Sequence, residues 1–248
     1  MSDLAQEEAS VQASSLQKGE ILLEARGLSK GFPGVWEHLI LDRLDFDVRA
    51  GEVHTLLGEN GAGKTVIANI LSGYYDKTEG EILIRGKPVD LTSPRDGLAH
   101  GIAMVHQELM LVPAFTVAQN VMVGLNAPAL SFGLAEVERR LDELVAHYGL
   151  KVDPRARVED LSAGEQQRVE ILKVLFHEPQ VLLLDEPTSL LTPGEADQLF
   201  VVLRAMADEG KGIVFISHKM REVFAVSDRV TVLKLGKMQG TCHISETD

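Results

Sequence analysis

The chain has 248 residues, a hydrophobic content of 45% and a formal net charge of −13 at pH 7. This length suits one large or two small domains, and the apolar content is enough for a packed core. So acidic a protein is a poor candidate for unaided binding to nucleic acid or to anionic lipid. Because Cys242 is the single cysteine, no disulfide can form within the chain, which suits the cytosol.

The sequence shows neither a membrane-spanning nor a secretory segment. Its apolar runs are far shorter than the about 20 residues that a spanning helix needs. The N-terminus has no basic region followed by an apolar one, so we expect no signal peptide. Residues 1–19 are polar and lack aromatics, which predicts a mobile tail ahead of a domain over 20–248. Any role at a membrane must then come through a partner.

From Ile21 onward, short apolar runs alternate with helical patterns. The runs that predict strands are EILLEA, LDFDV, VHTLL, EILI, IAMV, VLLLD, GIVFIS and RVTVLK. Helical patterns begin near Lys64, Pro94, Val117, Leu134, Ala163, Pro193 and Lys219. The late strands are continuously apolar, which favours a parallel sheet covered on both faces, whereas the runs over about 23–83 fit a smaller antiparallel sheet. Between about 108 and 160 helical patterns dominate, which predicts a helical subdomain inserted into the α/β core.

A glycine-rich loop, GENGAGKT, follows the strand that ends at Leu57. Its spacing, G-x-x-x-x-G-K-T between a strand and a helix, is that of a phosphate-binding loop. Glycines let backbone N–H groups surround phosphate oxygens, Lys64 supplies a charge for the β- and γ-phosphates, and the Thr65 hydroxyl can bind Mg²⁺. A turn that merely starts a helix would not need both residues in register. The candidate binding residues are Gly58, Glu59, Asn60, Gly61, Ala62, Gly63, Lys64, Thr65 and Val66.

An acidic pair, Asp185 and Glu186, ends the apolar run VLLLD. Ligands of open α/β sheets bind at the carboxyl ends of the strands, which is where this pair would lie. Asp185 would hold Mg²⁺, and Glu186 would accept a proton from the attacking water or orient it. An acidic turn after a strand is the alternative interpretation, and the phosphate-binding loop favours the functional one.

Polar residues that could bind nucleotide also lie at one predicted helix start and directly after two predicted strands. Ser162 and Glu165 form a capping box at a helix start, whose free N–H groups could also meet phosphate, including that of a nucleotide held by another copy. Gln107 follows the strand IAMV and could sense Mg²⁺ or the water; His218 follows GIVFIS and could contact the γ-phosphate. A lone Gln or His after a strand is more often solvated or satisfied within the core.

Taken in order, these segments resemble the nucleotide-binding subunit of an ABC transporter over about residues 21–241. The matching segments are the P-loop 58–65, the Q-loop Gln107, the signature 161–165, the acidic pair, the D-loop 189–192 and the switch histidine His218. The resemblance implies a P-loop NTPase (RecA-like) core with an antiparallel β-subdomain and an inserted α-helical subdomain. It also implies ATP and Mg²⁺ as ligands and ATP hydrolysis as the activity. The implied metal site is Thr65, Gln107 and Asp185, and the implied catalytic residues are Glu186, His218, Gln107 and Lys64.

Longer stretches, such as GEVHTLLGENGAGKT and ISHKMREVFAVSDRVTVL, resemble the importers of simple sugars and nucleosides. In that family two such domains are normally fused, and this chain resembles the first. The resemblance implies a second nucleotide-binding domain, either a second copy or a fused or separate half. Ser162 and Gly164 would then act in trans on the partner's ATP. Phe32 would stack on adenine, although an ordinary core aromatic is an equal interpretation.

The same resemblance implies further partners and a location. Transmembrane permease subunits would dock in a groove near residues 107–120, and a solute-binding protein would take part indirectly. The protein would lie peripherally on the cytoplasmic face of the cell membrane, with no nucleic acid partner. Two alternatives stay open: a non-transport ATPase of the same fold, and a regulatory half that hydrolyses ATP weakly.

Three departures from the family pattern bear on the site. Val66 stands where a second hydroxyl is usual, so we expect nucleotide binding to be weaker by about 0.5–1.5 kcal/mol, the net value of one neutral hydrogen bond. The signature reads SAGE instead of SGGQ, and Glu165 adds negative charge near a phosphate. The insertion WEHL after Val35 lengthens the loop beyond Phe32 and puts the adenine contact in question.

Overall fold

The computed structural model describes residues 17–32, 39–125 and 133–247. The strands are β1 (Ile21–Lys30), β2 (Leu41–Arg49), β3 (Glu52–Leu57), β4 (Glu79–Ile84), β5 (Lys87–Val89), β6 (Ile102–Val105), β7 (Val181–Asp185), β8 (Gly212–Ser217), β9 (Arg229–Lys234) and β10 (Lys237–His243). The helices are α2 (Lys64–Leu71), α3 (Pro94–Ala99), α4 (Val117–Val123), α5 (Leu134–Tyr148), α6 (Ala163–Leu175), α7 (Pro193–Asp208) and α8 (Met220–Val226), with 3₁₀ turns η2 (Val158–Asp160) and η3 (Ile244–Glu246).

The larger sheet has six strands in the order β10-β9-β3-β8-β7-β6. All neighbouring pairs are parallel except β9 and β10. Strands β7 and β8 are buried along their whole length, as expected of parallel strands covered on both faces. The predicted parallel sheet is therefore confirmed, and its strands β3, β8, β7 and β6 end at one common edge.

The smaller sheet is antiparallel, with strand order β2-β1-β4-β5. The prediction of such a sheet over about 23–83 is confirmed for β1, β2 and β4. It is wrong for the run VHTLL, because β3 pairs with β8 and β9 in the larger sheet. Residues 52–56 are all buried, so β3 needs cover on both faces and not on one. The edge strands β5 and β10 have no apolar run and were not predicted.

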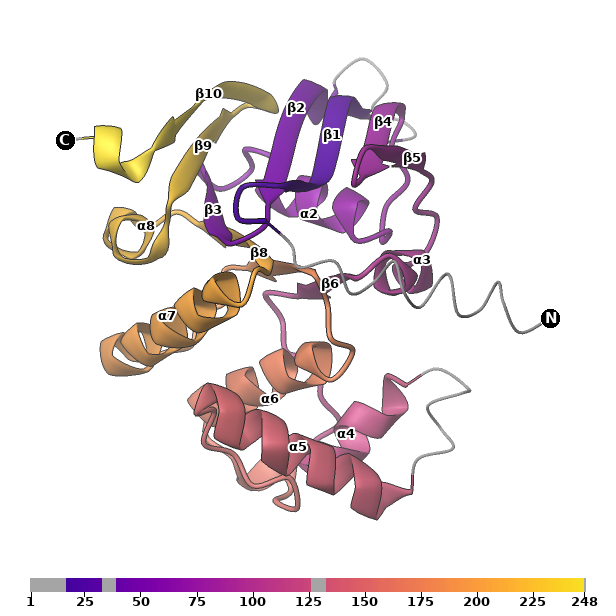
Figure 1. Cartoon of the computed structure of the whole chain (residues 1–248), viewed down its shortest axis with the longest axis vertical. Helices are drawn as coiled ribbons and strands as arrows, with labels where there is room; N and C mark the ends of the chain where they lie inside the picture. The colour runs from indigo at the N-terminus through magenta and orange to yellow at the C-terminus, as the bar shows by residue number, and fades with distance from the viewer. Residues whose placement is uncertain (1–16, 33–38, 126–132, 248) are drawn as a thin grey trace.

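Helices α4, α5 and α6 pack on one another at the end of the molecule opposite the smaller sheet (Figure 1). Their common core includes Val117, Val137, Leu141 and Val169. Each predicted helix start is present: Ser93 caps α3, and capping boxes begin α4 at Thr116, α6 at Ser162 and α7 at Thr192. Because α6 lies outside the span 108–160 and still packs with α4 and α5, the bounds of the helical subdomain stay a prediction.

Two other sequence predictions concern the N-terminal tail and the membrane-spanning helices. The predicted tail, 1–19, falls mainly outside the described residues; at its end, the Gly19 N–H donates to the Ala50 carbonyl at 2.9 Å. Over the described ranges, no helix combines the length and the apolar character that a membrane crossing requires.

An ion-pair network joins the two sheets. Arg229 of β9 donates to both carboxylate oxygens of Asp47 on β2, at 2.9 and 2.8 Å, and to Glu52 of β3 at 2.8 Å. Burial raises the pKa of Asp47, but hydrogen bonds from Arg229 and Arg49 outweigh it and hold the pKa at about 2. Arg229 and Glu52 are both buried, so the network is sensitive to loss of one partner.

We therefore expect Arg229→Met to lower the free energy of unfolding by about 3–5 kcal/mol, because it leaves the buried Glu52 without its cation and Asp47 with Arg49 alone. Denaturant unfolding at pH 7 measures this change. Arg26→Met is the matched control, since Arg26 forms an exposed ion pair with Glu24 and its loss should cost about 1 kcal/mol or less.

The same network predicts the acid dependence of stability. The pKa of Asp47 is depressed in the folded state, so its contribution is complete above the ordinary value near 3.8 and is lost as the pH falls through about 2. In Arg229→Met this loss between pH 4 and 2 should be smaller than in the parent chain. If Arg229→Met and the parent chain lose the same free energy of unfolding between pH 4 and 2, the loss does not come from the pairing of Asp47 with Arg229.

Candidate functional site

The glycine-rich loop joins β3 to α2 at the common edge of the parallel sheet. Gly61 and Gly63 have φ angles of +81° and +107°, which residues with a Cβ rarely adopt. A Cβ at Gly58 would collide with the carbonyl oxygen of Leu233 on β9. The loop therefore needs glycine at these positions for reasons of conformation and of space.

Lys64 begins α2 and points back into the loop. Its Nζ donates to the carbonyls of Gly58 and Glu59, at 2.7 and 3.0 Å, and the residue is 5% exposed. Burial lowers the pKa of Lys64, while the nearby carboxylates of Glu186 and Asp185 act in the opposite direction. The loop thus contains a cation held by carbonyl oxygens, which an anionic ligand can attract away.

Asp185 ends β7 with its side chain buried beside the loop. It is 1% exposed, and its Oδ1 has no hydrogen-bond partner among the described residues. Burial raises the pKa of Asp185, while the Thr65 side chain beside it acts to lower that pKa. A buried carboxylate oxygen without a partner is costly, and a hydroxyl lies next to it; these are the hard oxygen donors that Mg²⁺ prefers. The residues present therefore fit this ion.

Glu186 and His218 leave neighbouring strands and contact each other. His218 Nδ1 lies 2.9 Å from Glu186 Oε1. Glu186 has a φ of +46°, and its N–H donates to the carbonyl of Ile216 on β8 at 3.1 Å. The adjoining strand thus holds the acidic turn in an unusual conformation and directs the carboxylate towards the histidine.

A pocket of about 400 Å³ unites the glycine-rich loop with residues distant in sequence. It is lined by Ile40, Asn60, Gly61, Gly63, Lys64, Thr65, Val66, Gln107 and Glu186. Gln107 is exposed and follows β6, the strand at the far end of the parallel series. The structure therefore brings Gln107, Glu186 and the loop together, as the sequence predicted; His218 is connected to the pocket through Glu186.

Phe32 does not line this pocket. Its ring meets Tyr75 edge-on with centroids 5.6 Å apart, and Lys30 Nζ lies 4.9 Å from the ring centroid. Trp36, Glu37 and His38 of the predicted insertion WEHL lie outside the described residues. Stacking of Phe32 on adenine stays a prediction.

The signature residues lie at the start of α6, away from the pocket's lining. The Ser162 hydroxyl donates to Glu165 Oε2 at 2.7 Å, and this hydrogen bond lowers the pKa of Glu165. Glu165 also accepts from the Ser162 N–H at 2.9 Å. The Glu165 carboxylate, which was expected to add negative charge near a phosphate, therefore accepts hydrogen bonds from the residue that caps its own helix.

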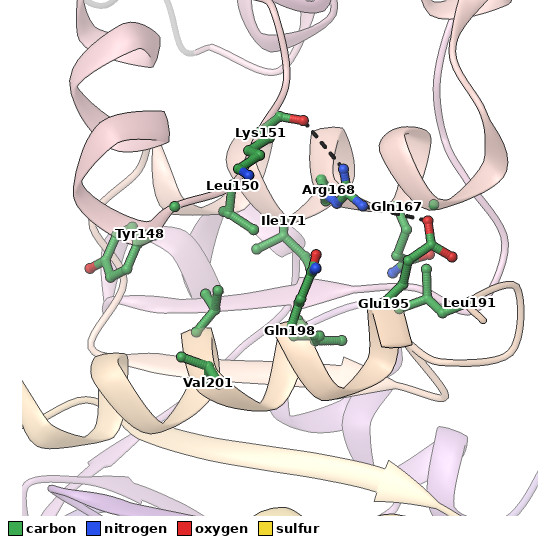
Figure 2. Close-up of a pocket in the computed structure, with 14 residues that line it drawn as sticks. Tyr148, Leu150, Lys151, Gln167, Arg168, Ile171, Leu191, Glu195, Gln198 and Val201 are labelled. Atoms are coloured by element: carbon green, nitrogen blue, oxygen red, sulfur yellow. Dashed lines mark hydrogen bonds and ion pairs between the residues drawn. The ribbon is translucent and has the colours of Figure 1, made fainter. Parts of the chain in front are cut away.

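Gly164 lines a second pocket, of about 300 Å³, between the end of α5, α6 and α7 (Figure 2). A Cβ at Gly164 would collide with the Glu195 carboxylate of α7. Arg168 donates to the same carboxylate at 3.4 Å and to the Lys151 carbonyl at 3.3 Å, from one side of the pocket (Figure 2). Gly164 therefore lies close to the Glu195 side chain of its own chain, a contact that the sequence did not indicate.

Two features of the surroundings were missed from the sequence. Glu222 of α8 is buried beside the acidic turn, and its only sequence signal is an acidic residue one helical turn after His218. A groove of about 220 Å³ lies next to the Q-loop, and its lining includes Tyr74, His106, Met110 and Glu170. The His106 ring meets Tyr74 edge-on, and its Nε2 is buried without a partner among the described residues.

Comparison with known proteins gives close relatives over most of the chain. A family model described as ABC transporter matches residues 41–189. The glucose import ATP-binding protein TsgD13 of Haloferax volcanii is 44% identical, over 92% of this chain and 46% of that protein. The ribose import ATP-binding protein RbsA 1 of Rubrobacter xylanophilus is 46% identical, over 88% and 44%. The nucleoside import ATP-binding protein NupA of Lactococcus lactis is 43% identical, over 83% and 41%.

Solved structures share the fold. A nucleotide-free ATP-binding cassette from an ABC transporter superposes with a TM-score of 0.79 at 22% identity, covering 90% of this chain and 91% of that one. CbiO1 from Clostridium perfringens superposes with a TM-score of 0.78 at 29% identity, covering 92% of this chain and 90% of that one. The chain spans about half the length of the relatives named above. The family match over residues 41–189, together with these identities, shows that the chain belongs to the ABC transporter family.

Proposed function

We propose that the chain binds ATP with Mg²⁺ in the P-loop pocket and hydrolyses it to energise an importer. The observation that carries this proposal is the contact between Glu186 and His218, at 2.9 Å, beside a pocket that contains Lys64, Thr65 and Gln107. A phosphate-binding loop, a candidate base and a candidate γ-phosphate contact thus share one edge of the sheet. Phosphoryl transfer needs mainly such positioning and charge stabilisation.

Phosphate binding would use the loop and the start of α2. Backbone N–H groups of residues 58–65 would surround the phosphate oxygens. The ammonium of Lys64 would exchange the carbonyls of Gly58 and Glu59 for the β- and γ-phosphates. The exchange is favourable because a charged acceptor makes a stronger hydrogen bond than a neutral carbonyl.

Thr65, Asp185 and Gln107 would hold the magnesium ion. The buried, unpartnered Oδ1 of Asp185 supports this assignment. When bound, the ion neutralises charge on the phosphate oxygens. Asp185 contributes the negative charge at the end of β7, and Gln107 reaches the pocket from β6.

Glu186 would take a proton from the attacking water, and His218 would contact the γ-phosphate. The contact between the two side chains keeps each in place before substrate arrives. Gln107 lines the same pocket and would orient the water. These roles follow from where each strand ends, so loss of one side chain should affect turnover more than the fold.

A second nucleotide-binding domain would complete the site. Ser162 and Gly164 lie outside the lining of their own chain's P-loop pocket, which supports a role in trans. The chain also spans only about half of its relatives. The second domain would be another copy of this chain, or a fused or separate half.

The groove beside the Q-loop supports docking of a permease subunit. Met110 lines it and is 55% exposed, and Phe115 and Val112 add exposed apolar side chains nearby in sequence. An apolar groove next to Gln107 would connect a membrane partner with the ATP site. The protein would then lie peripherally at the cytoplasmic face of the membrane, with a solute-binding protein acting through the permease. The names of the relatives support simple sugars or nucleosides as the solute.

A weakly hydrolysing regulatory half is the second candidate. Two observations favour it: Val66 lines the pocket without a hydroxyl, and the Ser162 hydroxyl is engaged by Glu165. Tight ATP binding without turnover, measured with the partner domain and permease present, would select this function over the first.

Glu186→Gln should lower steady-state ATP turnover of the assembled transporter by about 10²- to 10⁴-fold, because an amide cannot accept the proton of water. Phosphate release measures the change. Glu143→Gln, on the exposed surface of α5, is the matched control and should keep full turnover. Undiminished turnover in Glu186→Gln would refute the assigned base.

Val66→Thr should tighten ATP binding by about 0.5–1.5 kcal/mol, because it adds one hydroxyl to the lining of the pocket. Titration calorimetry with a non-hydrolysed ATP analogue measures the affinity. Val66→Ala is the control, because it changes the volume without adding a donor. Equal affinities in all three proteins would show that the missing hydroxyl does not limit binding.

Met110→Glu should weaken co-purification with the permease subunits and leave ATP affinity unchanged, because it places a charge in the apolar groove. Val201→Glu is the control, since Val201 is 70% exposed on α7, away from the groove. Equal recovery of permease with both variants would contradict docking at this surface.

A further inference from the structure

We propose that Glu222 is a positioning residue that sets the contact between Glu186 and His218. It touches neither the P-loop pocket nor those two side chains in the described structure. Its effect would pass through their backbone neighbours. The inference rests on the proposed function, because it assigns Glu222 to the same reaction.

The Glu222 carboxylate is buried and fully engaged. The residue is 8% exposed. The Thr188 hydroxyl lies 2.8 Å from both carboxylate oxygens, and the Ser217 hydroxyl donates to Oε2 at 2.8 Å. Lys219 Nζ lies 3.0 Å from Oε1 and compensates the buried charge. A carboxylate with this many donors is a rigid junction and not a solvated surface group.

The two hydroxyl donors belong to the segments that carry the proposed catalytic pair. Thr188 comes two residues after Glu186, in the turn that follows β7, and is 3% exposed. Ser217 comes directly before His218, at the end of β8, and is 2% exposed. One carboxylate therefore connects the backbone after Glu186 with the backbone before His218.

Further hydrogen bonds extend this junction around His218. The Ser217 hydroxyl also accepts from the Lys219 N–H at 3.1 Å, so the backbone is held on both sides of the histidine. Glu186 has its own tie to β8, through its N–H and the Ile216 carbonyl. With the backbone fixed in this way, the remaining freedom of the pair is in its side chains, and the 2.9 Å contact restricts that.

Loss of the carboxylate would leave the two hydroxyls without their acceptor, and Lys219 Nζ would keep only its longer contacts with the Thr188 carbonyl and hydroxyl, at 3.5 and 3.4 Å. The turn after Glu186 and the segment around His218 could then move independently. A displacement of about 1 Å in a catalytic constellation can cost about 100-fold in rate. The P-loop contacts do not involve Glu222, so nucleotide binding should be spared.

The test compares Glu222→Ala, Glu222→Gln and Glu52→Gln with the parent chain. In the assembled transporter, Glu222→Ala should lower kcat for ATP by about 10- to 100-fold and leave KM within about twofold. Glu222→Gln keeps one oxygen acceptor and the shape of the side chain, so it should recover part of the rate. Glu52 is equally buried, at 8% exposed, but belongs to the inter-sheet ion pair. Glu52→Gln should lower Tm without lowering kcat.

A double-mutant cycle separates positioning from general stability. In a His218→Ala background, adding Glu222→Ala should lower kcat by much less than it does alone, because the contact that it sets is already absent. Fully multiplicative effects, or a fall in kcat that follows Tm across all variants, would overturn the proposal.

A spectroscopic measurement keeps this inference distinct from the proposed function. The imidazole nitrogen resonances of His218, recorded by NMR on the 248-residue chain without nucleotide, should shift in Glu222→Ala and stay in place in Glu52→Gln. Unmoved resonances in Glu222→Ala would refute the positioning role even if the transporter hydrolyses ATP. If the parent transporter shows no turnover, the proposed function fails, and the resonances still decide whether Glu222 controls His218.

Discussion

The pairing of parallel strands in the larger sheet is the constraint on which the rest of the molecule depends. Leu57 of β3 pairs with Ser217 of β8, and Asp185 of β7 pairs with Ile216. Because these strands are parallel and end at nearly the same level, the residues that follow them meet at one edge. The P-loop, the acidic turn and His218 are neighbours for this reason, although more than 150 residues separate the first from the last.

Buried carboxylates of this chain fall into two groups that differ in how well they are satisfied. Glu52 and Glu222 are buried and accept hydrogen bonds from a cation or from hydroxyls, which hold elements together. Asp185 is buried more deeply, at 1% exposed, but has an oxygen without a partner in the described structure. Since an unsatisfied buried oxygen costs free energy, its persistence beside Thr65 fits a site that a cation completes.

The proposed second domain gives a physical reason for the separation of the signature from the P-loop. Within one chain, Ser162 caps α6 and Gly164 lies close to Glu195, so the signature has contacts of its own without the P-loop. These contacts shape a helix start that is exposed at Ser162. In the proposed pair of domains, this surface would meet the partner's nucleotide without a change in its own fold. The Ser162 hydroxyl, however, already donates a hydrogen bond to Glu165 and would have to leave it to contact a phosphate.

Local chemistry was enough to predict the P-loop segment, the acidic pair, the capping box at Ser162, the helix starts and most strands, because each depends on neighbours within a few residues. The placement of β3 in the parallel sheet, the proximity of Gly164 to Glu195 and the proposed role of Glu222 depend on contacts between segments far apart in the chain. The sequence by itself indicated which residues are candidates for binding phosphate and metal. Only the tertiary structure decided which of them share a pocket, because the order of strands in a sheet is set by packing across the whole core and not by the period of any one segment.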